Sequence, residues 1–307
     1  MRLASYRGAG VQFRTGAVVR ESVIDLTDVV ASIEIPADRA EALAQRGVSP
    51  PAGGMLRLLY AGPRAMRELA QRVESLARDE ARHTPLKEIA LLAPIPRPGK
   101  IVAIGRNYAD HARETGVDPF EKPRIIAKLP SSVTGPGAAV KRPAAVTKMD
   151  FEAELAVVIG EFASGVPHAK ALDCVAGYTA LNDLSAREFQ FDVSPPQTTF
   201  AKSMDGFCPM GPWLVTKDEI PDPQALELGC RVNGKAMQHG STADMIFPVD
   251  RLIEYVTQYM TLEPGDVIAT GTPAGVGAFR KPPVWLKPGD RVRIEISRVG
   301  ILENNIV

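Results

Sequence analysis

The strongest chemical signal in the sequence is a pair of glutamates, Glu152 and Glu154, within the apolar segment 151–159. Side chains two positions apart on a strand point to the same face, so a strand here places the two carboxylates side by side. Their repulsion and lost hydration call for a cation, and oxygen ligands suit hard ions such as Mg²⁺, Mn²⁺ or Ca²⁺. An exposed edge strand with two solvated glutamates fits the same pattern equally well.

A third carboxylate, Asp183, follows the apolar segment 175–181. At the end of a strand it could complete a metal site with Glu152 and Glu154. An Asn-Asp pair such as Asn182-Asp183 is, however, more often a turn or a helix cap. The metal site therefore depends on the fold bringing the two segments together.

A histidine and a glutamate three positions apart, His111 and Glu114, would face the same side of a helical turn. A carboxylate beside an imidazole fixes its tautomer and raises its basicity, as a general base requires. A surface helix of mixed charge is the plainer interpretation. The other three histidines, His83, His168 and His239, have no such neighbour and are expected to be structural or exposed.

Two further segments could contact an anion. Lys202 lies in an apolar stretch, where a buried ammonium could stabilise an oxyanion, although an exposed lysine is the ordinary expectation. The glycine-rich segment 269–277 could present free N–H groups to a carboxylate, and a plain turn is equally compatible with it.

The elements that must position these residues fall into two parts. Residues 1–93 contain short strand candidates and an amphipathic helix with Met66, Leu69, Val73 and Leu76 on one face, and they are predicted to form an accessory region. The proline-rich segment 94–99 is a linker candidate. Residues 94–307 are predicted to form the catalytic domain.

The predicted catalytic domain is rich in strand patterns. Apolar strands are expected over 100–104, 151–159 and 175–181, and a helix over 249–260. Two similar Pro-Gly-Asp sequences, at 264–266 and 288–290, predict type II turns that lead into strands.

Composition excludes several classes of protein. The 307 residues contain 36 basic and 36 acidic side chains, so charge gives no reason to expect nucleic acid or an anionic membrane as a partner. The three cysteines are widely spaced, which argues against a disulfide framework or a cysteine zinc site. With no apolar run near the roughly 18 residues of a membrane helix and no signal-peptide pattern, we expect a cytoplasmic protein.

Taken in order, these segments resemble the fumarylacetoacetate hydrolase family from about Lys100 to the C-terminus. The matching stretches are GRNYADHARETG, KLPSSVTGPG, MDFEAELAVVIG, VAGYTALNDLSARE, FAKSMDGFCPMGPWLVT and LEPGDVIATGTPAGVG. The resemblance implies an α+β, β-rich fold, a mixed β-sandwich roll preceded by a small N-terminal α/β region. It also implies a homodimer.

The resemblance also implies roles for individual residues. Mg²⁺ or Mn²⁺ would be held by Glu152, Glu154 and Asp183. The catalytic residues would be His111, Glu114 and Lys202, and the substrate would be positioned by Arg106, Tyr108, Lys128 and Thr272. The sequence departs from the family at Met204 and Gly206, where an aromatic residue and a Thr or Ser are common, and 189–199 lacks a common tryptophan. These departures are expected near the distal end of the substrate.

The function implied is metal-dependent hydrolysis of a C–C bond in an acylpyruvate-type 2,4-dioxo acid, which releases pyruvate or a related 2-oxo acid. Oxaloacetate decarboxylation and dienol isomerisation pass through the same kind of enolate and remain alternatives. Hydrolysis ranks first because the His111–Glu114 pair supplies a base for water that decarboxylation does not need. A dimer that only binds a 2-oxo acid is a further alternative.

Overall fold

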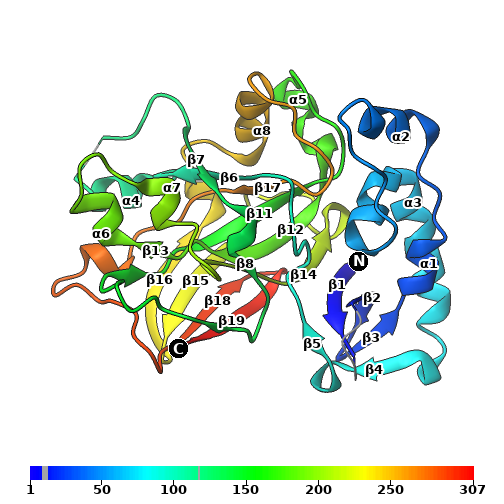
Figure 1. The fold of residues 1–307 in the computed structure, drawn as a ribbon, viewed down its shortest axis with the longest axis horizontal. Coiled ribbons are helices and arrows are strands. Elements are labelled where there is room, and N and C mark those ends of the chain that lie inside the picture. Colours follow the sequence, from blue (N-terminus) through cyan, green and yellow to red (C-terminus); the bar gives the residue numbers. More distant parts are fainter. Residues whose placement is uncertain (9–12, 117) are drawn as a thin grey trace.

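The computed structural model of the protein describes residues 1–8, 13–116 and 118–307. Its main feature is a large mixed sheet with the strand order β4-β3-β2-β1-β14-β12-β11-β17-β6-β7, in which β5 also pairs with β1 and β8 with β14. A second sheet has the order β16-β15-β18-β19-β9. Helices flank the two sheets (Figure 1), and the expected β-rich α+β fold is confirmed.

The N-terminal region joins the main sheet directly. Its elements are β1 (Arg2–Arg7), β2 (Phe13–Val19), β3 (Ser22–Asp25), α1 (Thr27–Ala31), α2 (Ala37–Ala44), α3 (Gly54–Leu76), β4 (His83–Pro85) and β5 (Ala90–Leu91). β1 pairs antiparallel with β14, with Leu3 opposite Leu214. Strands on both sides of the expected boundary after residue 93 thus belong to one sheet, and the division into two domains remains a prediction.

The rest of the chain supplies the other strands and the helices near the site. The main sheet contains β6 (Ile101–Gly105), β7 (Arg124–Lys128), β8 (Val133–Thr134), β11 (Ala153–Ile159), β12 (Val175–Asn182), β14 (Cys208–Thr216) and β17 (Val267–Ala269). The second sheet contains β9 (Ala139–Val140), β15 (Glu227–Val232), β16 (Lys235–Ser241), β18 (Arg291–Ile296) and β19 (Gly300–Ile306), while β10 (Met149–Asp150) pairs with β13 (Ser185–Ala186). The helices are α4 (Ala109–Glu114), α5 (His168–Ala171), α6 (Arg187–Phe191), α7 (Thr198–Ala201) and α8 (Val249–Thr257).

Strand β11 is buried on both faces, which explains its unbroken apolar sequence. Leu155 and Val157 belong to one core, together with residues of the second sheet. Ala156 and Val158 belong to the other core, which includes the buried side of α3. The alternative of an exposed edge strand around Glu152 and Glu154 is therefore wrong, because β11 lies between β12 and β17.

Two local predictions can be compared with the structure. Both Pro-Gly turns are confirmed as type II, with φ of +92° at Gly265 and +93° at Gly289. The helix predicted to reach Met260 ends at Thr257, and Tyr259 and Met260 are 69% and 40% exposed. The predicted helix is therefore three residues too long at its C-terminal end.

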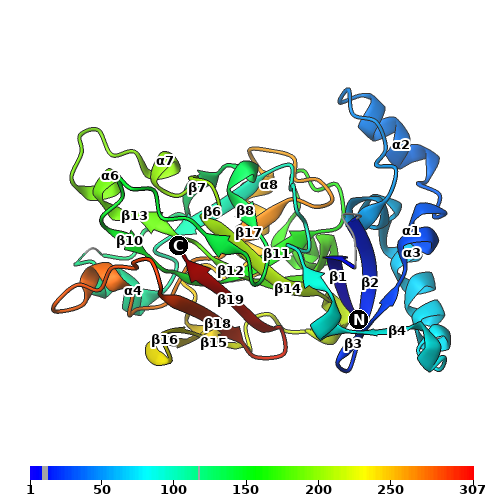
Figure 2. The same ribbon diagram turned by 60° about the horizontal axis from the view of Figure 1, so that its bottom comes forward.

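The helices α4, α6 and α7 lie at the opposite end of the molecule from the N-terminal helices (Figures 1 and 2). Within the described residues, no helix is both long enough and apolar enough to cross a membrane. The cytoplasmic location remains a prediction.

Candidate active site

Three carboxylates meet where β11 and β12 lie side by side. Glu154 is on β11, Glu152 immediately precedes this strand, and Asp183 immediately follows β12. Ala153 pairs with Asn182, and the Asp183 N–H donates to the Glu152 carbonyl at 2.9 Å, so the register itself brings the segments together. One ligand atom from each carboxylate lies within 4.8 Å of the others, and all three residues are buried. This juxtaposition is what a divalent-cation site requires.

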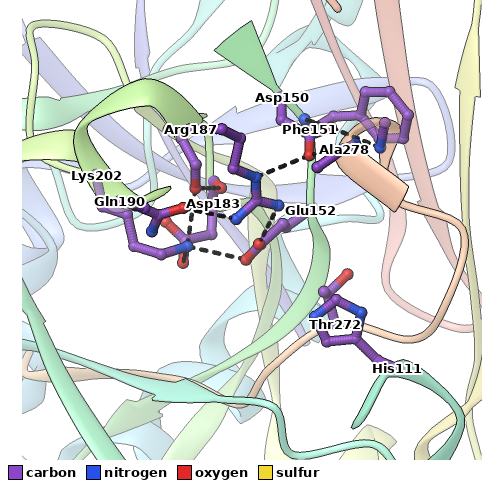
Figure 3. A network of polar contacts seen from close by, with 12 residues as sticks. His111, Asp150, Phe151, Glu152, Asp183, Arg187, Gln190, Lys202, Thr272 and Ala278 are labelled. Atoms are coloured by element: carbon purple, nitrogen blue, oxygen red, sulfur yellow. Dashed lines mark hydrogen bonds and ion pairs between the residues drawn. The ribbon is translucent and has the colours of Figure 1, made fainter. Parts of the chain in front are cut away.

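Buried cations contact two of the three carboxylates, Glu152 and Asp183 (Figure 3). The Lys202 ammonium donates to Glu152 at 2.9 Å, to Asp183 at 2.6 Å and to the Ser185 hydroxyl at 2.9 Å. The Arg187 guanidinium donates to the other oxygen of Glu152 at 2.6 Å. Charge-assisted bonds of this length hold the carboxylates in fixed positions.

The pKa values of the two glutamates shift in opposite directions because their neighbours differ. Burial acts to raise the pKa of Glu152, but Lys202 and Arg187 outweigh it and bring this pKa well below its usual range. For Glu154, burial and then the charges of Asp183 and Glu152 raise the pKa well above its usual range. Among the described contacts, Glu154 accepts a hydrogen bond from the Gly271 N–H at 2.8 Å. A hard divalent cation would supply the positive charge that Glu154 lacks, so the residues fit such an ion.

The histidine–glutamate pair forms as the spacing predicts. His111 and Glu114 lie on α4, and His111 Nδ1 is 3.1 Å from Glu114 Oε2. The other oxygen of Glu114 accepts from the Gly275 N–H at 3.0 Å, and Asp110 accepts from the Ala274 N–H at 3.3 Å. These two N–H groups of the glycine-rich segment therefore bind side chains of α4, not a ligand.

One cavity of about 260 Å³ contains most of the predicted residues. Its wall includes the three carboxylates, His111, Lys202, Thr272 and Arg106. The Thr272 hydroxyl donates to the Ala153 carbonyl at 2.9 Å and accepts from Gln238 Nε2 at 2.7 Å, which fixes it beside β11. The predicted metal ligands, the predicted base and Lys202 thus line one small cavity.

Two of the predicted substrate contacts do not line this cavity. Neither Tyr108 nor Lys128 is among the described residues that line the cavity. Tyr108 is fully buried in the hydrophobic core. The Lys128 ammonium donates to Asp183 at 2.7 Å, to the Phe207 carbonyl at 3.0 Å and to the Lys202 carbonyl. The geometry of Lys128 is that of a residue that positions Asp183.

Two of the three departures from the family pattern also do not line the cavity. Met204 packs against the core and Gly206 adopts a φ of +76°, and neither is among the described residues of the cavity wall. Pro196 and Thr198, from the segment without the tryptophan, do line it. Of the three departures, only segment 189–199 lines the cavity, as expected.

Several residues of the site escaped prediction. Asp150 accepts from the Gly277 N–H at 2.7 Å, the Ala278 N–H at 3.0 Å and Arg187 at 2.8 Å, and so connects the glycine-rich segment to the carboxylate cluster. Arg124 and Gln190 line the cavity. Asp150 lies two positions before Glu152, and Arg187 lies four positions after Asp183, so their closeness in the sequence to predicted ligands could have indicated them. Nothing in the sequence indicated Arg124.

The three buried carboxylates could hold a metal ion, and they line a small cavity, which is the arrangement of a metal-dependent enzyme site. Residues 100–307 match the sequence model described as fumarylacetoacetate (FAA) hydrolase C-terminal. The chain belongs to the fumarylacetoacetate hydrolase family, as its motifs predicted.

Relatives in this family have different named activities. Human "oxaloacetate tautomerase FAHD2A, mitochondrial" is 46% identical over 223 residues, which are 73% of this chain and 71% of that protein. The structure of maleylpyruvate hydrolase from Sphingobium sp. SYK-6 with manganese(II) and pyruvate is 30% identical, with a TM-score of 0.77, and covers 100% of this chain and 99% of that one. The 5-carboxymethyl-2-hydroxymuconate delta-isomerase of Mycobacterium smegmatis is 32% identical, with a TM-score of 0.71, and covers 100% and 98%.

Proposed function

We propose that the protein is a divalent-metal-dependent enzyme that moves a proton between carbon and oxygen in a small 2-oxo acid, with keto–enol tautomerisation of oxaloacetate as the first candidate reaction. The observation that carries this proposal is that His111, held by Glu114, lines the same cavity as the three carboxylates. The name of the relative that is 46% identical supports the same reaction.

The hydrogen bond between His111 and Glu114 indicates which ring nitrogen would act as the base. With His111 Nδ1 bonded to Glu114, Nε2 is the ring nitrogen that remains to exchange a proton with a substrate. Nε2 would take a proton from the carbon next to the 2-oxo group and return it to the oxygen, which gives the enol, and the reverse order gives the keto form. Glu114 keeps the imidazole oriented and stabilises its charged state.

Glu152, Glu154 and Asp183 would hold the cation, which when bound supplies Lewis acidity at the 2-oxo and carboxylate oxygens of the substrate. The Thr272 hydroxyl already donates its hydrogen to the Ala153 carbonyl, so towards a substrate at the same end of the cavity it would act only as an acceptor. Phe279, 6.1 Å from His111 between ring centroids, would help to exclude water from this nitrogen.

Lys202 favours proton transfer over C–C hydrolysis. Hydrolysis needs a donor for the oxyanion that forms when water adds to a carbonyl, and Lys202 was predicted to be that donor. Its ammonium already makes three hydrogen bonds within the protein, to Glu152, Asp183 and Ser185. Tautomerisation needs only the base and a chelated substrate.

Hydrolysis of an acylpyruvate remains the second candidate. It is supported by the structure of maleylpyruvate hydrolase with manganese(II) and pyruvate, which covers the whole of this chain at 30% identity, as the delta-isomerase structure also does at 32%. Decarboxylation and dienol isomerisation remain alternatives at the same site.

A side-by-side assay separates the two candidates. Enol oxaloacetate would be followed by the loss of its ultraviolet absorbance and acetylpyruvate by pyruvate release, each with Mg²⁺, Mn²⁺ or EDTA. We expect metal-dependent tautomerisation that falls about 10²–10⁴-fold in His111→Ala. His239→Ala is the matched control, because the His239 side chain is 83% exposed. Faster turnover of acetylpyruvate would assign the protein as a hydrolase, and turnover of neither would refute the proposal.

The predicted homodimer and cytoplasmic location stand as predictions. Sedimentation velocity of the purified protein tests the first, and fractionation of the source cells tests the second.

A further inference from the structure

Two arginines, Arg106 and Arg124, line the same cavity and come from the ends of neighbouring strands. Arg124 begins β7 and is paired with Gly105 of β6, and Arg106 follows Gly105 directly. Gly105 leaves room for this arrangement, because a Cβ there would lie 3.2 Å from Arg124 Cδ. Both arginines line the cavity that contains the carboxylate cluster.

Neither arginine is neutralised by the protein in residues 1–8, 13–116 and 118–307. No carboxylate of these residues lies within ion-pair distance of either guanidinium. Lys202 and Arg187, the other cations of the cavity wall, each contact carboxylates. Arg106 and Arg124 therefore differ from them in having charge to offer a ligand.

The backbone of Arg106 has an unfavourable conformation. Arg106 has a φ of +57°, a left-handed conformation that is unfavourable for a residue with a side chain. Its guanidinium lies over the Phe120 ring, 5.6 Å from the centroid. Burial, followed by the charge of Arg124, lowers the pKa of Arg106, as expected where two like charges are close. Strain and repulsion at one place are typical of a site that an anion completes.

The distance between the two ends of the cavity suits a short dianion. In the main sheet, β7 is separated from β11 by β6 and β17. Three strand spacings amount to about 14 Å between the backbones, and the long arginine side chains shorten the gap that a ligand must cross. A four-carbon dicarboxylate, with one end at the carboxylate cluster and its cation, would reach the guanidinium groups with the other end.

We propose that Arg106 and Arg124 form a subsite for the second carboxylate of the substrate, so that the enzyme selects dicarboxylic 2-oxo acids over monocarboxylic ones. This proposal rests on the proposed function for the orientation of the substrate. Arg124 is exposed and Arg106 half-buried, so the subsite is partly hydrated and its contribution is smaller than that of a fully buried pair.

Binding of two stable analogues tests the subsite without any turnover. Malate and lactate differ by one carboxylate, and their dissociation constants would be measured by titration calorimetry on the Mg²⁺-loaded protein. We expect malate to bind about 10-fold more tightly than lactate. Arg124→Gln and Arg106→Gln should each reduce this preference several-fold, mainly by weakening malate. Arg113→Gln on α4 removes the same charge from an exposed residue outside the described cavity wall and should preserve the preference.

The outcomes separate the subsite from the proposed reaction. Equal affinities in the unaltered protein, or a preference that survives both substitutions, would overturn the subsite even if oxaloacetate is tautomerised. A preference lost in both variants but kept in the control would support it even if no tautomerase activity is found. Measuring the unfolding midpoint of each variant shows whether the fold is intact.

Discussion

Replacing Lys128 with methionine distinguishes a residue that positions Asp183 from one that contacts substrate. Methionine keeps most of the side-chain volume but cannot donate the three hydrogen bonds that Lys128 makes to Asp183 and to the carbonyls of Phe207 and Lys202. The Lys128 side chain is 0% exposed, so water cannot replace these bonds. Asp183 would be left with a buried charge that is only partly compensated.

The expected loss of stability depends on the hydrogen bonds that Asp183 keeps. Removing one partner of a buried ion pair typically destabilises a protein by about 3–5 kcal/mol. Asp183 keeps its 2.6 Å bond to Lys202, so we expect the lower end, about 3 kcal/mol of unfolding free energy.

Urea unfolding in EDTA measures this loss directly. Lys122→Met is the matched control, since Lys122 is exposed and its replacement should change stability by less than about 0.5 kcal/mol. A loss below about 1 kcal/mol in Lys128→Met, together with a raised KM, would show that the ammonium serves the substrate and that the reasoning is wrong.

Two further predictions concern the site as a whole. The cations Lys128, Arg187 and Lys202 stand against four carboxylates, Asp150, Glu152, Glu154 and Asp183, so a bound divalent ion leaves a net positive charge that an anionic ligand would offset. Calorimetry should therefore show Mg²⁺ binding at least about 5-fold more tightly with saturating pyruvate, and equal affinities would contradict this. Gly277→Ala should lower the unfolding free energy by about 1–3 kcal/mol and reduce activity, because its Cβ would lie 2.0 Å from the Val284 carbonyl oxygen and 2.6 Å from Asp150. The control Gly53→Ala adds a methyl group with nothing within 4 Å, so a similar loss there would point to a general effect of the substitution.

Much of the site could be predicted because its key pairs are local in sequence. Glu154 lies on β11 and Glu152 two positions earlier, directly before the strand, and both reach the same cluster. His111 and Glu114 share a face of α4 through the period of a helix. These relations hold wherever the segment forms its expected element. The type II turns at Gly265 and Gly289 were predictable for the same reason, since a positive φ favours glycine.

Other features depend on contacts between distant segments, and only the tertiary structure decided them. Lys202 reaches Glu152 across 50 positions and Lys128 reaches Asp183 across 55, so a sequence pattern could name these lysines but could not say what they bind. Arg124 acquires its place beside Arg106 only through the pairing of β7 with β6.

The sequence by itself determined which chemical groups are present and which neighbours along the chain share a face, because backbone geometry enforces the strand and helix periods locally. The tertiary structure decided which charges neutralise each other, because a buried carboxylate takes the nearest cation in space. For this reason Lys128 is bound to Asp183, whereas Arg106 lines the cavity.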